Sequence, residues 1–209
     1  MSNLFIQTVR FAIRIPNIFL KMLWLPYYYI VLAIFHVRCN KIDLLRCMKG
    51  YNIKIRNHGV MSIGTKTVLS TNNPIGDAHP NLSLICAAGA RLSIGNNSGI
   101  SNSTILAKES ILIGDNVMIG ADCKIYDWDF HSIRYRDRMA KTDTTVASKP
   151  VEIKDGAWIG AHSIILKGTV IGKRAVIGAG SVVAGKIIGD DEIWAGNPAR
   201  FIRKIDQNS

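Results

Sequence analysis

A six-residue period in the C-terminal half constrains this chain more than any other feature. Aliphatic residues recur without a gap from Ile153 to Val183, and five of the six residues that stand four places after them are small. A period of six matches neither an ordinary strand nor a helix. Hexapeptide repeats specify a parallel β-helix, in which each hexad forms one short strand and one corner. The aliphatic positions are Ile153, Ile159, Ile165, Ile171, Ile177 and Val183.

The same period appears upstream of this run, with one interruption. It slips by one residue after Leu106, resumes at Ile113, and is absent over residues 126–152, which are polar. We expect this insertion to be a loop that leaves the solenoid, and long loops of this kind often carry function. The upstream aliphatic positions are Ile63, Leu69, Ile75, Ile94, Ile100, Leu106, Ile113, Ile119 and Ile125, with Ser98, Thr104 and Ser110 as the small corner residues.

The chain divides into three parts. Residues 1–50 form an apolar and basic segment that we expect to be helical, residues 51–190 form the β-helix with its inserted loop at 126–152, and residues 191–209 form a tail. The length of 209 residues and the 48% apolar content suit one core-forming domain with an appendage. The longest uncharged run, residues 22–35, is shorter than the roughly 20 residues that a membrane span needs.

The positive charge is concentrated at the N-terminal end. The net charge is +11, and residues 1–60 contain nine basic residues but only one acidic residue, Asp43. This asymmetry favours an anionic membrane surface or an anionic ligand at that end, and the lack of any nucleic-acid-binding motif argues against DNA or RNA. Two compatible interpretations stay open for residues 1–37, a helical cap on the core and peripheral contact with a membrane.

The cysteines do not form a redox or metal motif. None of Cys39, Cys47, Cys86 and Cys123 belongs to a Cys-x-x-Cys pair. Reduced thiols are typical of the cytoplasm, so we expect a cytoplasmic protein, with the inner membrane face as an additional location.

Three motifs give the chain a family resemblance. Residues 126–131 read Tyr-Asp-Trp-Asp-Phe-His where the repeat breaks, residues 158–162 read Trp-Ile-Gly-Ala-His, and residues 195–203 read Ala-Gly-Asn-Pro-Ala-Arg-Phe-Ile-Arg. With the hexads, these resemble the hexapeptide-repeat acyltransferases, in particular the sugar O-acetyltransferase branch typified by the galactoside and maltose acetyltransferases and the polysaccharide-modifying enzymes.

The resemblance implies an all-β solenoid, a left-handed parallel β-helix, that assembles as a homotrimer with acetyl-CoA between neighbouring subunits. It places the catalytic histidine at His131, which would act as general base on a sugar hydroxyl of a bacterial surface polysaccharide or its precursor. Asp127 or Asp129 would orient the imidazole. The resemblance further implies CoA contacts from Trp158, Ala161, Ala179, Ala184, Arg200 and Arg203, and acceptor contacts from Ser101 and Asn102.

The chain also departs from the family pattern. Ser132 follows His131 where relatives often have proline, and the residues before the tail differ from the usual Thr-Lys-Asp. Three alternatives remain: a metal enzyme, a non-enzymatic scaffold, and an acetyltransferase for serine, an antibiotic or an amino sugar. No close pair of histidines supports a metal site, so we expect none.

Overall fold

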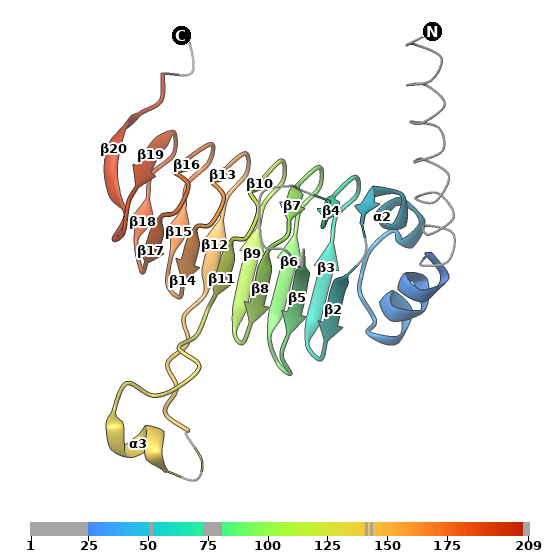
Figure 1. Ribbon diagram of the computed structural model, residues 1–209, viewed down its shortest axis with the longest axis horizontal. Coiled ribbons are helices and arrows are strands. Elements are labelled where there is room, and N and C mark those ends of the chain that lie inside the picture. Colours follow the sequence, from blue (N-terminus) through green and yellow to red (C-terminus); the bar gives the residue numbers. More distant parts are fainter. Residues whose placement is uncertain (1–24, 51, 73–80, 141, 143, 207–209) are drawn as a thin grey trace, which may run out of the picture.

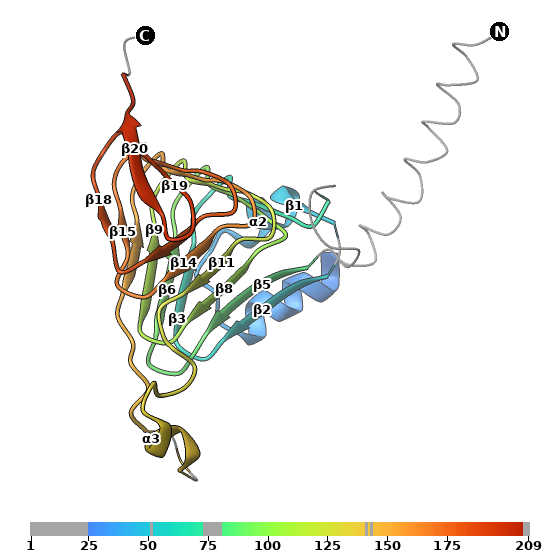
Figure 2. The same cartoon turned by 60° about the vertical axis from the view of Figure 1, so that its left-hand side comes forward.

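The chain folds into a three-sided prism of parallel strands. The computed structural model describes residues 25–50, 52–72, 81–140, 142 and 144–206, and in it the strands stack coil on coil along one axis (Figures 1 and 2). The predictions made for residues 1–24 and for Ile75 lie outside the described residues. This arrangement fits the predicted left-handed parallel β-helix.

Three sheets form the sides of the prism, and we name them A, B and C. Sheet A contains β3 (Val60–Ile63), β6 (Arg91–Ile94), β9 (Ser110–Ile113), β12 (Val151–Ile153), β15 (Val170–Ile171) and β18 (Ile187–Ile188). Sheet B contains β1 (Met48–Lys49), β4 (Val68–Ser70), β7 (Gly99–Ser101), β10 (Met118–Ile119), β13 (Trp158–Ile159), β16 (Val176–Ile177), β19 (Glu192–Ala195) and the antiparallel β20 (Arg200–Lys204). Sheet C contains β2 (Ile53–Asn57), β5 (Leu82–Cys86), β8 (Thr104–Ala107), β11 (Lys124–Tyr126), β14 (Ile164–Leu166) and β17 (Val182–Ala184).

The chain visits the sheets in the order C, A, B, so the prism has three edges, C–A, A–B and B–C. The predicted aliphatic column of the C-terminal half fills the interior, because each of those six residues is at most 1% exposed. Ala157, Ser163, Thr169, Ala175 and Ser181 are fully buried. Each coil therefore buries its neighbour's apolar side chains and shares its backbone hydrogen bonds.

The repeat changes phase at two places, and the sequence pattern located the first of them wrongly. Ile105, not Leu106, points inward, because Ile105 is fully buried and pairs with Leu84 and Ile125 in adjacent coils. The small inward residue of that coil is accordingly Ser103, not Thr104. In the last coil Ile187 is 81% exposed, and its neighbour Ile188 fills the interior opposite Ile171.

The inserted segment leaves the prism at the C–A edge between β11 and β12. It carries the short helix α3 (Tyr135–Met139) and is closed at its base by an antiparallel bridge between Trp128 and Ser148. Figure 1 shows it projecting from the middle of the prism, away from the coils on either side.

The first coils are covered by helical structure. Residues 25–34 are helical, and Tyr28 and Leu32 on this helix are buried against the prism. Helix α2 (Lys41–Cys47) follows, capped by the Asn40 side chain, which accepts the Asp43 N–H at 3.2 Å. Within the described residues, no helix is both long and apolar enough to cross a membrane.

Candidate functional site

Asp127 ties the start of the inserted loop to the preceding coil. Its side chain is fully buried after β11. One carboxylate oxygen accepts the Lys108 N–H at 2.8 Å, and the other accepts the N–H groups of Glu109 and Ser110 at 2.7 Å each. Charge-assisted bonds of this kind are stronger than bonds between neutral groups, so Asp127 fixes the corner between β8 and β9.

This geometry differs from the predicted orienting role of Asp127. Both carboxylate oxygens accept backbone amides of the preceding coil, so the bonds described for Asp127 hold the loop base. Asp129 is also engaged elsewhere, because it forms an ion pair with Lys167 and its N–H donates to Ala147 O at 3.0 Å. Both aspartates therefore anchor the base of the loop within one chain.

His131 lies on the exposed side of this anchored base. Its backbone N–H donates to Asp129 O at 2.5 Å, and its side chain is exposed to solvent. The ring of Phe130 lies 5.1 Å from that of Tyr126 and 4.9 Å from that of Trp128, so an aromatic cluster supports the turn that carries the histidine. An exposed imidazole on a packed turn can accept a proton from a bound hydroxyl.

Trp158 lies on the outer face of sheet B. It is 54% exposed and pairs in register with Met118, which is 63% exposed on the adjacent strand. Two large apolar side chains are thus presented side by side to solvent, where they can contact a ligand lying along the sheet.

Ala161 and Ala179 follow Trp158 along the B–C edge in successive coils. The backbone of each is approached closely by a glycine of the preceding coil. A Cβ on Gly120 would lie 2.6 Å from Ala161 N, and one on Gly160 would lie 2.5 Å from Ala179 N. Only glycine fits these two positions, so successive coils stack closely at this edge.

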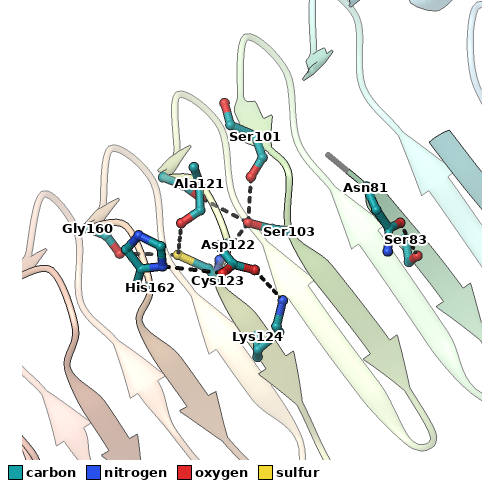
Figure 3. Close-up of polar contacts among 11 residues, drawn as sticks. Asn81, Ser83, Ser101, Ser103, Ala121, Asp122, Cys123, Lys124, Gly160 and His162 are labelled. Atoms are coloured by element: carbon teal, nitrogen blue, oxygen red, sulfur yellow. Dashed lines mark hydrogen bonds and ion pairs between the residues drawn. The ribbon is translucent and has the colours of Figure 1, made fainter. Parts of the chain in front are cut away.

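Ser101 and Asn102 occupy the same edge two coils earlier. Figure 3 shows the ladder that stabilises this edge. The Ser103 hydroxyl donates to Ser101 O at 2.7 Å and accepts the Cys123 N–H at 2.9 Å, and the Cys123 thiol lies 3.2 Å from Gly160 O. Burial raises the pKa of the Cys123 thiol, so this side chain is a core residue and a poor nucleophile.

The sequence analysis missed a charged cluster on the solvent side of this ladder. Asp122 lies 2.5 Å from Lys124 Nζ and 3.3 Å from His162 Nδ1, and Figure 3 shows the three together. The hydrogen bond from Lys124 holds the pKa of Asp122 below its usual value, with a smaller contribution from His162. Asp122 and His162 both have positive φ, at 59° and 60°. The inserted loop interrupts the repeat between these two residues, so the hexad spacing alone does not show that they stack.

The remaining predicted residues lie apart from this edge. Ala184 ends β17 and pairs in register with Leu166, so it stands on the C–A side with the loop. Arg200 and Arg203 lie on β20, where both are exposed at the C-terminal end of sheet B.

The predicted site is therefore divided between two edges of sheet C within one chain. Asp122 precedes β11 at the B–C edge and Asp127 follows it at the C–A edge, so the strand β11 separates the corner residues from the His131 loop. Trp158, Ala161, Ala179, Ser101 and Asn102 belong to the first group, and His131, Asp127, Asp129 and Ala184 to the second. Within the described residues, no group of three metal-ligating side chains is assembled.

Comparison with known families agrees with the repeat pattern. A model described as bacterial transferase hexapeptide (six repeats) matches residues 150–185, and one described as the hexapeptide repeat of succinyl-transferase matches residues 110–125. Both models describe hexapeptide repeats, and the predicted resemblance to the hexapeptide-repeat acyltransferases is confirmed.

Curated relatives carry the name "Putative acetyltransferase". One from Staphylococcus aureus (strain COL) is 44% identical over 59 residues, which are 28% of this chain and 29% of that protein. One from Saccharomyces cerevisiae is 48% identical over 58 residues, again 28% of this chain and 29% of that protein. The alignments thus span less than a third of the length of these relatives.

Solved structures share the fold. A mutant of AntD, an N-acyltransferase from Bacillus cereus in complex with dTDP and coenzyme A, is 22% identical with a TM-score of 0.60, over 83% of this chain and 86% of that one. A second AntD mutant, in complex with dTDP-4-amino-4,6-dideoxyglucose and coenzyme A, is 24% identical with a TM-score of 0.56, over 82% and 84%. At these identities the likeness concerns the fold alone.

Proposed function

We propose that the chain is an acetyl-CoA-dependent O-acetyltransferase that acts on a sugar hydroxyl of a bacterial surface polysaccharide or its precursor. The observation that carries this proposal is the combination of transferase-type hexads with an exposed histidine on a doubly anchored loop. A scaffold would need neither the anchored loop nor the exposed Trp158 on its outer face.

His131 is the general base in this proposal. A sugar hydroxyl is a weak nucleophile at neutral pH, and a neutral imidazole can remove its proton as the oxygen attacks. The new bond joins that oxygen to the thioester carbonyl carbon, the carbon–sulfur bond breaks, and the departing sulfur takes the proton from the imidazolium. Transfer is direct, because the buried Cys123 is unsuited to hold an acyl group.

Acetyl-CoA supplies the activated thioester, and the B–C edge offers the residues to hold it. The backbone amides of Ala161 and Ala179 lie on this edge in successive coils, and Trp158 with Met118 offers an apolar surface. Arg200 and Arg203 on β20 bring cations suited to the nucleotide phosphates, and Ala184 lies at the C–A edge, at the end of β17.

The divided site supports a homotrimer. Residues at two edges of one prism act together only if a neighbouring copy brings its His131 loop to the B–C edge. In a closed ring of three prisms, each subunit would bring its His131 loop to one neighbour and would receive the loop of the other neighbour at its own B–C edge.

The acceptor binds at the B–C edge in this proposal. Ser101 and Asn102 lie on the same edge as the proposed CoA contacts, where they can orient an acceptor hydroxyl. An amino-sugar nitrogen is the second candidate, because the AntD structures contain dTDP or a dTDP-linked amino sugar. The reaction is placed in the cytoplasm, where acetyl-CoA is available.

Turnover measurements on wild type and on single variants test this function. Release of the free CoA thiol from acetyl-CoA would be measured in the presence of a panel of acceptors: sugars, nucleotide-linked amino sugars and lipid-linked glycans. We expect His131→Ala to lose about 10²–10⁴-fold in turnover. The matched control is His58→Ala, which removes an exposed histidine that follows β2 in the first coils and should keep turnover within a few-fold of wild type.

Mixed oligomers then test the shared site. Refolding a mixture of His131→Ala and Trp158→Ala chains should restore about a quarter of wild-type activity, because half-sites from the two chains recombine at random. A mixture no more active than its parents would place the whole site in one chain. Full turnover by His131→Ala would remove it from the mechanism.

A further inference from the structure

The helix at residues 25–34 is apolar on every face. It contains no charged residue, and Tyr28 and Leu32 pack it against the prism at 4% and 0% exposure. The opposite face carries Tyr29, Ile30 and Ile34, which are 48%, 54% and 64% exposed. A surface helix of a soluble protein normally presents polar residues there, so this face is suited to an apolar environment.

A cavity of about 610 Å³ is lined by this helix and by β2, which the Tyr28 hydroxyl joins by accepting the Ile53 N–H at 3.1 Å. The helix lines it with Tyr27 and Tyr28, Phe35 just after the helix also lines it, and β2 contributes the outward side chains of Lys54 and Arg56. One wall is thus aromatic and the other cationic. A ligand that fits both walls has an apolar body and an anionic group.

The charge around this helix is almost entirely positive. Between residues 25 and 66 of the sequence the only acidic residue is Asp43, and its carboxylate accepts the Lys66 N–H at 2.5 Å. On the other side, Lys41 Nζ lies 5.2 Å from the centre of the Tyr29 ring. The basic residues of this range are Arg38, Lys41, Arg46, Lys49, Lys54, Arg56 and Lys66.

We propose that this end of the prism is a docking surface for an anionic lipid bilayer. Tyr29, Ile30 and Ile34 would enter the interfacial region, and Lys54 and Arg56 would meet lipid phosphates at the cavity mouth. We call these five residues the first-coil surface. Charge complementarity selects this occupant, because a nucleic acid would leave the isoleucines exposed and a neutral apolar partner would leave the cations unmatched. The helix lies at the right of Figure 1, at the far end of the prism from β20.

Vesicle flotation with the full-length protein tests the proposal. The probes are phosphatidylcholine vesicles with and without about 30% phosphatidylglycerol. Each basic residue near such a surface contributes about fivefold to partitioning, so Lys54→Glu with Arg56→Glu should weaken binding to the anionic vesicles by at least about 25-fold. Ile30→Ser with Ile34→Ser should also weaken it, and raising the NaCl concentration should weaken wild-type binding.

Matched controls lie at the other end of the prism. Ile187 is 81% exposed and Lys186 is exposed beside it. Ile187→Ser with Lys186→Glu therefore makes one apolar-to-polar change and one charge reversal, the two kinds of change used above, at a distant place. This control should bind like wild type. Circular dichroism and acetyl-CoA binding should be unchanged in all variants, which separates this proposal from the catalytic one. It is overturned if wild type does not bind, if neutral vesicles bind equally well, or if the first-coil variants bind like the control.

Discussion

Asp127 gives the sharpest test of how the loop is built. The carboxylate is fully buried and accepts three backbone N–H groups, from Lys108, Glu109 and Ser110. In Asp127→Asn the remaining oxygen can serve Glu109 and Ser110, but the new NH₂ group then faces the Lys108 N–H. One bond is lost, two are weakened, and a buried donor has no acceptor.

The size of the effect follows from these contacts. A hydrogen bond to a charged group contributes about 1.5–3 kcal/mol, and a buried donor without an acceptor costs about 1–3 kcal/mol. We expect Asp127→Asn to lower the free energy of unfolding by about 3–5 kcal/mol. Asp190→Asn is the matched control, because Asp190 is exposed and accepts one N–H, from Lys173 at 2.7 Å. It should cost less than about 1 kcal/mol.

Urea denaturation and amide exchange measure the prediction. The urea concentration at the unfolding midpoint should be lower for Asp127→Asn than for wild type. Exchange of the backbone amide hydrogens of residues 108–110 should accelerate by roughly 10²–10³-fold, while the C-terminal coils keep their protection. A stability within about 1 kcal/mol of wild type, combined with a large loss of turnover, would refute the structural role. That result would return Asp127 to its predicted role beside His131.

Three further outcomes are expected. Gly160→Ala should destabilise the fold by several times more than Gly99→Ala in thermal melts, because the added Cβ meets Ala179 N at 2.5 Å in the first case and nothing within 4 Å in the second. Because the folded pKa of Asp122 is lowered, its contribution is present above the unfolded value of about 3.8 and is lost as the pH falls through the folded pKa. The stability difference between wild type and Asp122→Asn, below about 1 kcal/mol, should therefore vanish in acid, and a difference that grows in acid would contradict this. Cys123 should resist alkylation in the native protein, since burial raises its thiol pKa, and rapid labelling detected by mass spectrometry would show the coil to be open.

The interior of the prism was predictable because hexad spacing is a local property. Every residue of the column from Ile153 to Val183 is buried as the period requires. The phase error at Leu106 arises because corners differ in length by a residue, and the aliphatic neighbour Ile105 fits the period almost as well.

The partners of polar side chains were not predictable in the same way. The proximity of Asp127 to His131 in sequence suggested a pair, but the fold turns the carboxylate toward residues 108–110 of the previous coil. Asp122 and His162 lie on opposite sides of the inserted loop in the sequence, and only coil stacking brings them together. Such contacts depend on which corners are neighbours, which the hexad pattern alone does not state.

Acetyl-CoA titration by calorimetry tests the central claim most directly, because it requires no knowledge of the acceptor. The account predicts micromolar binding at about one site per subunit for wild type and for His131→Ala, and much weaker binding for Arg200→Ala with Arg203→Ala. Absence of detectable binding to the wild-type protein would contradict the proposed acetyltransferase function.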